Sequence, residues 1–534
     1  MISRSLPSTS APRISARNRF WLAAILIAGF QTGLAHAQLT QLYAFQYDST
    51  TVSNYPDGEN PLAELIQGAD GNYYTTTQSG GSGACPGESA AIPGCGTIVK
   101  ITPAGVFSVF YSFPYDSGSS APNGVNPQAG LLQGPDGNFY GVAAYGGTGG
   151  DFCGTNGGIF GCGTVFKLTP NGVLTVLHSF CGGNGCGSLA TDGAAPIGRL
   201  AIGSDGNLYG TTQSGGIYNG YYNSGTIFRV SLSGAYQIMY IFSGGARTGD
   251  GENPAAGLTF ASDGNFYGTT EFGGTSGFGT VFRMNLAGTV TILQNFAQFD
   301  PNGAQPEGAL IQASDGNLYG TCYSGGANGW GTVFRISTSG VFTKLYDFTQ
   351  AAGNVGYLPK AGVIQASDGN LYGTTWEGGP DDAGTIYQMT LSGVATIAAN
   401  FDANSSTGYS PVGALVQGSD GKMYVTAPSG GGVNSNGVPD QGTIDVFNAS
   451  LPVPKPGILG FVPSSGKVGT KVTIGLGPFI GATSVKFNGT SATFKVPGSE
   501  FITTTVPAGA TSGSISVTSP GGTTTSKEKF TVLP

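Results

Sequence analysis

The sequence predicts an all-β protein: a seven-bladed β-propeller closed by an N-terminal strand and followed by an immunoglobulin-like β-sandwich. Composition is the first reason. Of 534 residues, 94 are Gly and only 9% are charged, whereas 11% are aromatic. This favours short strands joined by tight turns. The second reason is an Asp-Gly pair that recurs at intervals of 52 to 69 residues, a period typical of propellers and other arrays. Its copies begin at Asp70, Asp136, Asp205, Asp263, Asp315, Asp368 and Asp420.

Each repeat reads as four antiparallel strands. An apolar run such as "ALIQ" (residues 309–312) precedes Asp-Gly, which is a strong hairpin signal because its turn needs positive φ angles. "NLYGT" follows as the second strand, "GTVFRI" (331–336) alternates with period two, and "VFTKLYDF" (341–348) is the fourth. Four strands in each of seven repeats predict a seven-bladed propeller over residues 38–450.

The two ends of the repeat region predict how the ring closes. The seventh repeat ends at "GTIDVF" (442–447) without a fourth strand, whereas "QLTQLYAF" (38–45) matches a fourth strand and precedes the first repeat. We expect residues 38–45 to complete the seventh blade and so to remove an open sheet edge. A Pro-rich linker (451–456) then leads to an all-β module over residues 457–534, which suits a small sandwich.

The N-terminal segment predicts export. Arg13, Arg17 and Arg19 precede the apolar run "FWLAAILIAGF" (20–30), and "AHA" (35–37) resembles a cleavage site. Residues 1–37 therefore predict a secretory signal peptide and a secreted or cell-surface protein; the alternative is an uncleaved anchor, although the run is shorter than the ~20 residues that a bilayer needs. No later segment is apolar enough to span a membrane.

Charge argues against a nucleic-acid partner. Residues 38–454 hold 10 basic and 27 acidic residues, a net charge of −17, whereas residues 455–534 hold seven Lys and two Glu. An acidic body repels phosphate backbones. The expected partner is therefore an extracellular glycan or protein.

Six of the seven cysteines fall in close pairs. In an exported chain this spacing predicts three local disulfides. The alternative is a metal site, but it lacks partner ligands, because His178 is the only histidine after the signal. The seventh, Cys322, replaces a Thr inside a strand and predicts a buried free thiol. The predicted pairs are Cys85 with Cys95, Cys153 with Cys162, and Cys181 with Cys186.

Two parts of the chain resemble known families. The units containing "SDGNLYGTT", "GG" and "GTVF" resemble the bacterial GloVer tandem repeat of choice-of-anchor-type secreted proteins, over about residues 38–450. That resemblance implies no established activity. The tail "GFVPSSGKVGTKVTI" (460–474) and "VPAGATSGSISVTSPGG" (506–522) is similar to an IPT/TIG immunoglobulin-like domain, which implies a spacer or binding module. "GPDGNFYG" (134–141) is also similar to the blade motif of streptogramin lyases. Those enzymes use a His as base, whereas His178, the only histidine after the signal, lies in an expected outer strand.

Acidic loops are candidates for Ca²⁺, a possible cofactor, because this ion prefers carboxylate and carbonyl oxygens. Loops such as "PDGENP" (56–61) and "GDGENP" (249–254) precede the first strand of each repeat and should lie near the channel mouth. The alternative is that Asp-Gly simply forms a turn. The candidate metal ligands are Asp57, Glu59, Asp192, Asp250 and Glu252.

Aromatic side chains near the Gly-Gly loops could stack on sugars or enter a protein interface. Together with the acidic loops they define the predicted ligand site: Asp57, Glu59, Asp250, Glu252, Tyr145, Phe272, Tyr323, Trp330 and Trp376. Glu271 and Glu377 occupy equivalent loop positions of repeats four and six and could form a carboxylate pair for glycoside cleavage. The alternative is that the rings cover blade edges and the acids are solvated.

The sequence therefore favours a secreted, non-enzymatic binding or adhesion protein that uses the propeller loop face. No nucleophile elbow, phosphate loop or zinc cluster is present, and no catalytic residue is predicted. Two alternatives stay open. One is a carbohydrate-active hydrolase or lyase at the channel mouth, which convergent carboxylates in a deep pocket would favour. The other is a purely structural surface protein.

Overall fold

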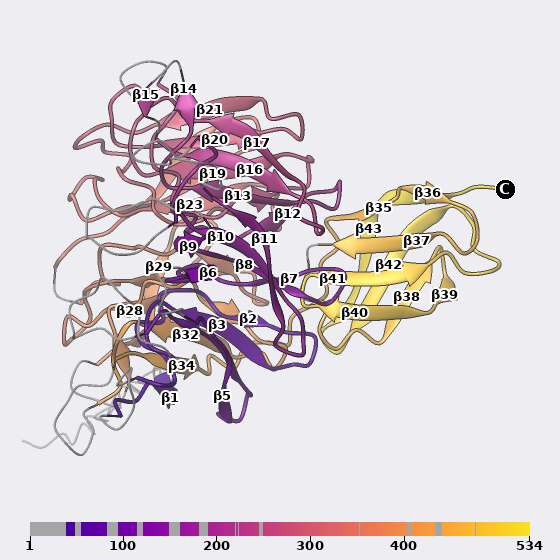
Figure 1. Cartoon of the computed structure of the whole chain (residues 1–534), viewed down its shortest axis with the longest axis horizontal. Helices are drawn as coiled ribbons and strands as arrows, with labels where there is room; N and C mark the ends of the chain where they lie inside the picture. The colour runs from indigo at the N-terminus through magenta and orange to yellow at the C-terminus, as the bar shows by residue number, and fades with distance from the viewer. Residues whose placement is uncertain are drawn as a thin grey trace, which may run out of the picture. The chain divides into compact units, whose positions relative to one another are not determined.

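The computed structural model describes residues 39–48, 55–82, 94–114, 121–148, 161–180, 191–218, 221–222, 224–244, 249–351, 353–402, 407–432, 441–475 and 477–534. These residues form an all-β structure, shown in Figure 1. The expected signal peptide lies outside them. Among the described residues no helix is long and apolar enough to cross a membrane.

Seven four-stranded antiparallel sheets follow one another along residues 39–447, one for each predicted repeat. The first four sheets, each given in strand order, are sheet 1 with β2 (Ile66–Gln67), β3 (Tyr73–Thr77), β4 (Thr97–Ile101) and β5 (Phe107–Ser112); sheet 2 with β7 (Leu132–Gln133), β8 (Phe139–Ala143), β10 (Thr164–Leu168) and β11 (Leu174–Ser179); sheet 3 with β12 (Ala201–Ile202), β13 (Leu208–Thr212), β16 (Thr226–Val230) and β17 (Tyr236–Ile241); and sheet 4 with β18 (Thr259–Phe260), β19 (Phe266–Thr270), β20 (Thr280–Met284) and β21 (Val290–Asn295).

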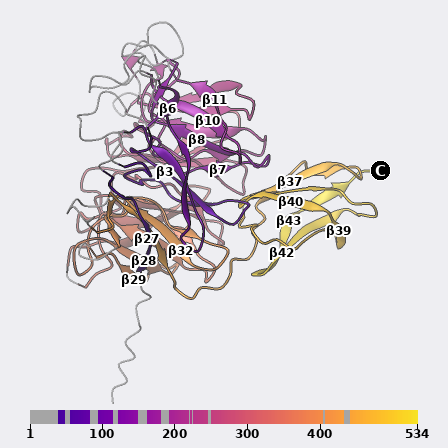
Figure 2. The ribbon, with the colours of Figure 1, turned by 60° about the horizontal axis from the view of Figure 1, so that its bottom comes forward.

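The last three sheets keep this order, and Figure 2 shows sheet 6 through β27, β28 and β29. They are sheet 5 with β22 (Ile311–Gln312), β23 (Leu318–Cys322), β24 (Thr332–Ile336) and β25 (Phe342–Asp347); sheet 6 with β26 (Ile364–Gln365), β27 (Leu371–Thr375), β28 (Thr385–Met389) and β29 (Ala395–Asn400); and sheet 7 with β31 (Val416–Gln417), β32 (Met423–Ala427), β34 (Thr443–Phe447) and β1 (Leu39–Ala44). Three two-stranded ribbons lie in the loops: β6 (Ala121–Val125) with β9 (Tyr145–Gly147), β14 (Ile217–Tyr218) with β15 (Tyr221–Tyr222), and β30 (Gly408–Tyr409) with β33 (Ser429–Gly430).

Sheet 7 joins the two ends of the repeat region. β1 pairs antiparallel with β34, from Leu39 opposite Phe447 to Ala44 opposite Thr443. The expectation that the N-terminal strand supplies the missing fourth strand is therefore confirmed. The following Phe45 is fully buried, and its backbone N–H donates to Gly442 O at 3.0 Å.

Contacts also connect sheet 7 to sheet 1. The backbone N–H of Ser419 donates to Gln67 Oε1 at 2.9 Å, and the hydroxyl of Thr426 donates to Ala63 O at 2.8 Å. The rings of Tyr73 and Tyr424 stack with centroids 3.9 Å apart. Equivalent Gln side chains connect sheets 4 to 5, 5 to 6 and 6 to 7 through Gln312, Gln365 and Gln417.

The tail contains two sheets around a separate apolar core. One is β35 (Gly460–Val462), β37 (Lys471–Gly475), β41 (Phe501–Thr505) and β40 (Phe494–Gly498). The other is β36 (Ser465–Gly466), β43 (Gly522–Val532), β42 (Gly513–Ser519), β38 (Ser484–Phe487) and β39 (Thr490–Ala492). Alternate residues of β42 point inward, as expected of a strand with one buried face, and Ile515 and Val517 join this core.

Candidate functional site

Two residue positions recur at the start of every repeat and are fixed by the same backbone frame. A residue with φ of 53° to 61° precedes a proline in all seven repeats: Asn60, Asn126, Ala195, Asn253, Gln305, Leu358 and Ser410. This left-handed region is sparsely populated by residues other than glycine, so the surrounding bonds must hold it. In six repeats its carbonyl accepts a hydrogen bond from the residue that follows the second strand, for example from Glu271 N to Asn253 O at 3.0 Å.

The frame is repeated, but the side chains it presents are not. The residue after the proline is Leu62, Gln128, Ile197, Ala255, Glu307, Lys360 or Val412 in repeats one to seven. The residue after the second strand is Gln78, Ala144, Gln213, Glu271, Tyr323, Trp376 or Pro428. Charged and aromatic residues thus concentrate in sheets 4, 5 and 6. We call Glu271, Glu307, Tyr323, Lys360 and Trp376 the Glu307 cluster.

Lys360 connects the aromatic members of this cluster. Its Nζ atom lies 4.2 Å from the ring centroid of Trp376 and 5.3 Å from that of Tyr323. Cation–π attraction at these distances holds the ammonium group on the ring faces. All three side chains are half-buried.

One carboxyl group of the cluster acts on the other. Burial and the charge of Glu271 together raise the pKa of Glu307 to about 7, against the opposing effect of Lys360. Burial also raises the pKa of Glu271, again against Lys360. Glu271 Oε2 accepts a hydrogen bond from Asn253 Nδ2 at 2.7 Å, whereas no donor among the described residues bonds to the Glu307 carboxyl group. Burial likewise raises the pKa of Tyr323, with Glu307 and Glu377 adding to the effect.

A cavity of about 600 Å³ reaches this cluster. Glu307 and Lys360 line it, together with residues at or just before the first strands of the seven sheets and residues of the tail such as Pro478 and Glu500. Ligand pockets commonly have this volume, with apolar walls and few convergent polar groups.

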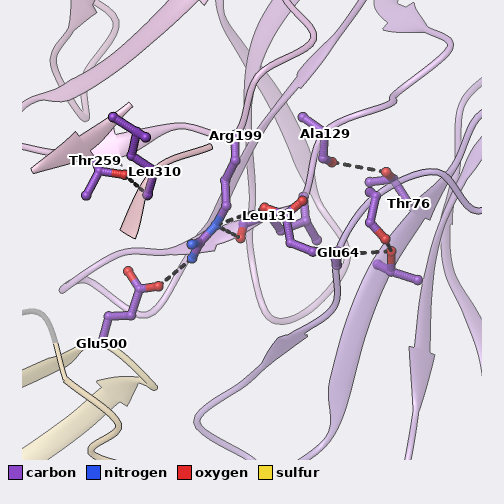
Figure 3. A network of polar contacts seen from close by, with 10 residues as sticks. Glu64, Thr76, Ala129, Leu131, Arg199, Thr259, Leu310 and Glu500 are labelled. Atoms are coloured by element: carbon purple, nitrogen blue, oxygen red, sulfur yellow. Dashed lines mark hydrogen bonds and ion pairs between the residues drawn. The ribbon is translucent and has the colours of Figure 1, made fainter. Parts of the chain in front are cut away.

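Arg199 is a further charged residue of the cavity wall. Figure 3 shows its guanidinium between Glu64 and Glu500, with Nε 3.8 Å from Glu64 Oε1 and donating to Leu131 O at 3.0 Å. Nη2 pairs with Glu500 Oε1 at 2.5 Å. Burial lowers the pKa of Arg199, but the two carboxylates outweigh it and the net shift is upward. Arg199 therefore stays charged, and its charge is compensated within the chain.

The predicted acidic loops bond mainly to outer strands. Asp57 accepts from Tyr43 OH at 2.5 Å, Asp250 accepts from Tyr240 OH at 2.8 Å, and Asp192 lies 3.0 Å from His178 Nε2. Glu59 is buried and accepts from Asn60 Nδ2, whereas Glu252 is exposed. Within the described part of the chain, no group of three His, Cys, Asp or Glu residues could hold a metal ion. Ca²⁺ binding remains a prediction.

The predicted aromatic residues are separated by the structure. Tyr323 and Trp376 belong to the Glu307 cluster, whereas Trp330 makes an edge contact with Tyr357 at 5.1 Å between ring centroids. Tyr145 packs against the core between sheets 1 and 2, and Phe272 is half-buried beside the Glu252 backbone. Glu377 is equivalent to Phe272, because each bridges the preceding loop, so Glu271 and Glu377 are not equivalent as the sequence suggested. The carboxyl group on which the charge of Glu271 acts is that of Glu307.

Glu307 and Lys360 were missed by sequence reasoning. A signal was present, because "PEG" and "PKA" stand where most other repeats have an apolar residue after the same proline. Only an alignment of the seven repeats at that position reveals it.

Cysteine placement agrees with the sequence where the structure describes it. Cys322 is a buried free thiol, as predicted, and burial raises the pKa of its thiol. Cys95 and Cys162 are buried. Cys85, Cys153, Cys181 and Cys186 lie outside the described residues, so the three disulfides stay predictions.

Comparison with known proteins identifies the repeat. The model of the Gloeobacter/Verrucomicrobia repeat matches residues 29–219 and 202–439. The chain belongs to this repeat family. In this Gloeobacter/Verrucomicrobia repeat protein, the Glu307 cluster lies inside the second matched region. No curated protein sequence matches the chain.

Solved structures similar to this repeat protein differ widely in described activity. A fungal alcohol oxidase in complex with copper aligns at 12% identity and a TM-score of 0.47, covering 93% of this chain and 100% of the other. A puromycin hydrolase aligns at 12% identity and a TM-score of 0.43, covering 82% and 62%. A protein of unknown function from Dyadobacter fermentans DSM 18053 aligns at 10% identity and 0.41, covering 77% and 99%. We draw no functional conclusion from similarities this weak.

Proposed function

We propose that the seven sheets are the blades of a closed propeller, with an IPT/TIG-type immunoglobulin-like domain at residues 457–534 and export directed by residues 1–37. The β1–β34 pairing and the contacts from sheet 7 to sheet 1 support closure. The cavity lined by residues at or just before the first strands of all seven sheets supports a common central channel. Two sheets around one apolar core support the tail domain.

Within this architecture, the protein is an extracellular binding or adhesion protein that holds a saccharide at the Glu307 cluster. The Glu307 cluster carries this proposal, because there the repeated backbone positions hold charged and aromatic side chains that the other repeats mostly lack. The Glu271 and Glu307 carboxylates can accept hydrogen bonds from sugar hydroxyl groups, the Asn253 amide can accept or donate, and Lys360 can donate. The Trp376 ring offers a flat apolar face. Recurring residues have structural roles in every blade, whereas these five do not recur.

A second function is supported by one observation. A glutamate whose pKa is raised to about 7 beside another carboxylate resembles the acid–base pairs of glycoside hydrolases. In that case Glu307 would protonate the leaving oxygen, and Glu271 would activate water or attack the sugar.

A glycan and polysaccharide array probed with the full chain after signal removal tests binding. We expect retention by the native protein, loss with Trp376→Ala, and full retention with the control Phe299→Ala, whose ring is 84% exposed outside the cluster. If Trp376→Ala is retained like the native protein, the proposed site is wrong. Analysis of the bound glycans for new reducing ends separates binding from hydrolysis, because cleavage lost in Glu307→Gln would establish the enzyme.

A further inference from the structure

Negative charge exceeds positive charge at the Glu307 cluster. The charge of Glu271 acts on Glu307, and Lys360 is the cation that acts on both. Glu377 lies close enough to influence Tyr323, and Glu252 is exposed in the loop beside Phe272. The Lys360 ammonium is also drawn toward the rings of Trp376 and Tyr323.

The Glu307 carboxyl group also lacks a donor. It is half-buried and lines the cavity, yet no described residue donates a hydrogen bond to it. Because the side chain lines the cavity, its oxygens are accessible to a ligand that donates hydrogen bonds. Charged donors form stronger bonds to carboxylates than neutral donors do.

We propose that the saccharide bound at the Glu307 cluster is an amino sugar with a free primary amine, whose ammonium group lies between the Glu307 and Glu271 carboxylates. This rests on the proposed function, since it names the class of sugar taken by the same site. The ammonium supplies the missing donor and offsets the excess negative charge. An N-acetylated sugar loses that charge and adds bulk, and an acidic sugar is repelled by both carboxylates.

The Trp376 face and the carboxylates have complementary tasks. The ring can pack against the apolar face of the pyranose, while the amine is read by the carboxyl pair. Burial and Glu271 raise the pKa of Glu307 to about 7, with Lys360 opposing and Tyr323 also nearby. Binding of the amine should therefore strengthen as pH rises toward neutrality and Glu307 loses its proton.

Calorimetric titration with a fully deacetylated glucosamine trisaccharide and its fully N-acetylated counterpart tests this inference. At neutral pH we expect the deacetylated sugar to bind at least about tenfold more tightly, which is about 1.4 kcal/mol. Glu307→Gln keeps the shape of the side chain and should abolish that preference, whereas Glu528→Gln, at an exposed position of β43 outside the cluster, is the control and should preserve it. Thermal unfolding of each variant establishes that it is folded. If Glu307→Gln is not folded, Glu307→Ala replaces it, because repeat four carries Ala255 at the equivalent position.

Equal or tighter binding of the N-acetylated sugar overturns the inference. So does an absence of binding to both trisaccharides when the array shows Trp376-dependent retention on another glycan; the proposed function then stands without the amino sugar. Absence of every Trp376-dependent glycan on the array instead overturns the proposed function itself.

Discussion

Asp315 shows at the scale of one residue why nearly the same decapeptide recurs. Its Oδ1 accepts the backbone N–H of Asn317 at 3.0 Å, and its Oδ2 accepts from Asn317 Nδ2 and Tyr319 OH, both at 2.8 Å. Gly316 between them has a φ of 84°. One carboxylate therefore closes the turn and anchors the second strand. The turn was predictable from Asp-Gly, whereas the bond to the Tyr hydroxyl depends on the strand pairing that follows.

Asp315→Ala should lower the free energy of unfolding by about 1–2 kcal/mol, because it removes these bonds and leaves a partly buried hydroxyl without its acceptor. Tyr319→Phe should cost less. A double-mutant cycle by denaturant unfolding checks the coupling, and we expect the double variant to be more stable than the sum of the two losses predicts. Strict additivity would contradict the shared bond.

Asp445 is a residue that the repeat pattern does not explain. It is fully buried in β34, where the other sheets place Val99, Phe166, Phe228, Phe282, Phe334 or Tyr387. Its Oδ2 accepts from Thr443 Oγ1 at 2.5 Å and Gly408 N at 3.2 Å, but Oδ1 has no hydrogen-bond partner among the described residues. Burial raises the pKa of Asp445 from 3.8 to about 7, against the hydrogen bonds from Thr443 and Gly408.

The native state should therefore keep a proton on Asp445 that the unfolded chain releases. Its contribution to stability is present below about pH 4 and falls as pH rises to about 7. Asp445→Asn should flatten that fall, giving a higher melting temperature than the native protein at pH 8 and a similar one at pH 4. Melting curves across this range check it; parallel curves for both proteins would contradict the assignment.

At the scale of elements, β1 was the easiest strand to place and the first strands of the repeats were the hardest. β1 was predictable for two reasons. The last repeat lacks a fourth strand, and the apolar residues of β1 match those of the other fourth strands. The first strands contain only two residues each, so a period-two pattern barely exists in them. Their function in lining the cavity follows from the contacts between sheets, which a single sequence does not display.

Phe45→Ala should destabilise the junction of β1 with sheet 7 by about 3–4 kcal/mol, because a fully buried ring leaves a cavity. Thr40→Ala, at an exposed position of β1, is the control and should change little. Thermal unfolding with light scattering should show earlier aggregation for Phe45→Ala alone, since an opened sheet edge promotes association. Equal behaviour of the two variants would show that β1 does not stabilise the closure.

At the scale of the whole molecule, the acidic loops and the Glu307 cluster differ in role. The loop aspartates bond within the fold, whereas the Glu307 cluster is the proposed ligand site. Tyr43, His178 and Tyr240 each contact a loop aspartate, in sheets 7, 2 and 3. The sequence predicted acidic residues near the loops but not these partners. Likewise it predicted Tyr323 and Trp376 as ligand residues. Glu307 and Lys360 require an alignment of the repeats to be noticed, and their position together on one cavity wall depends on the fold.

Chelation should reveal whether these loops need an ion for stability. Because their carboxylates already accept hydrogen bonds from outer-strand side chains, we expect EDTA to leave the melting temperature unchanged. Differential scanning calorimetry with EDTA and with added Ca²⁺ provides the measurement. A rise of several degrees with Ca²⁺ would support Asp57, Asp192 and Asp250 as metal ligands.

The central claim is that the asymmetric side chains of sheets 4 to 6 bind the ligand on a symmetric frame. The most direct measurement compares glycan retention by the native protein with that of a triple variant in which Glu307→Ala, Lys360→Val and Trp376→Gln copy residues that other repeats carry at the same positions. We predict an unchanged melting temperature and a complete loss of retention. Undiminished retention by the folded triple variant would contradict the claim.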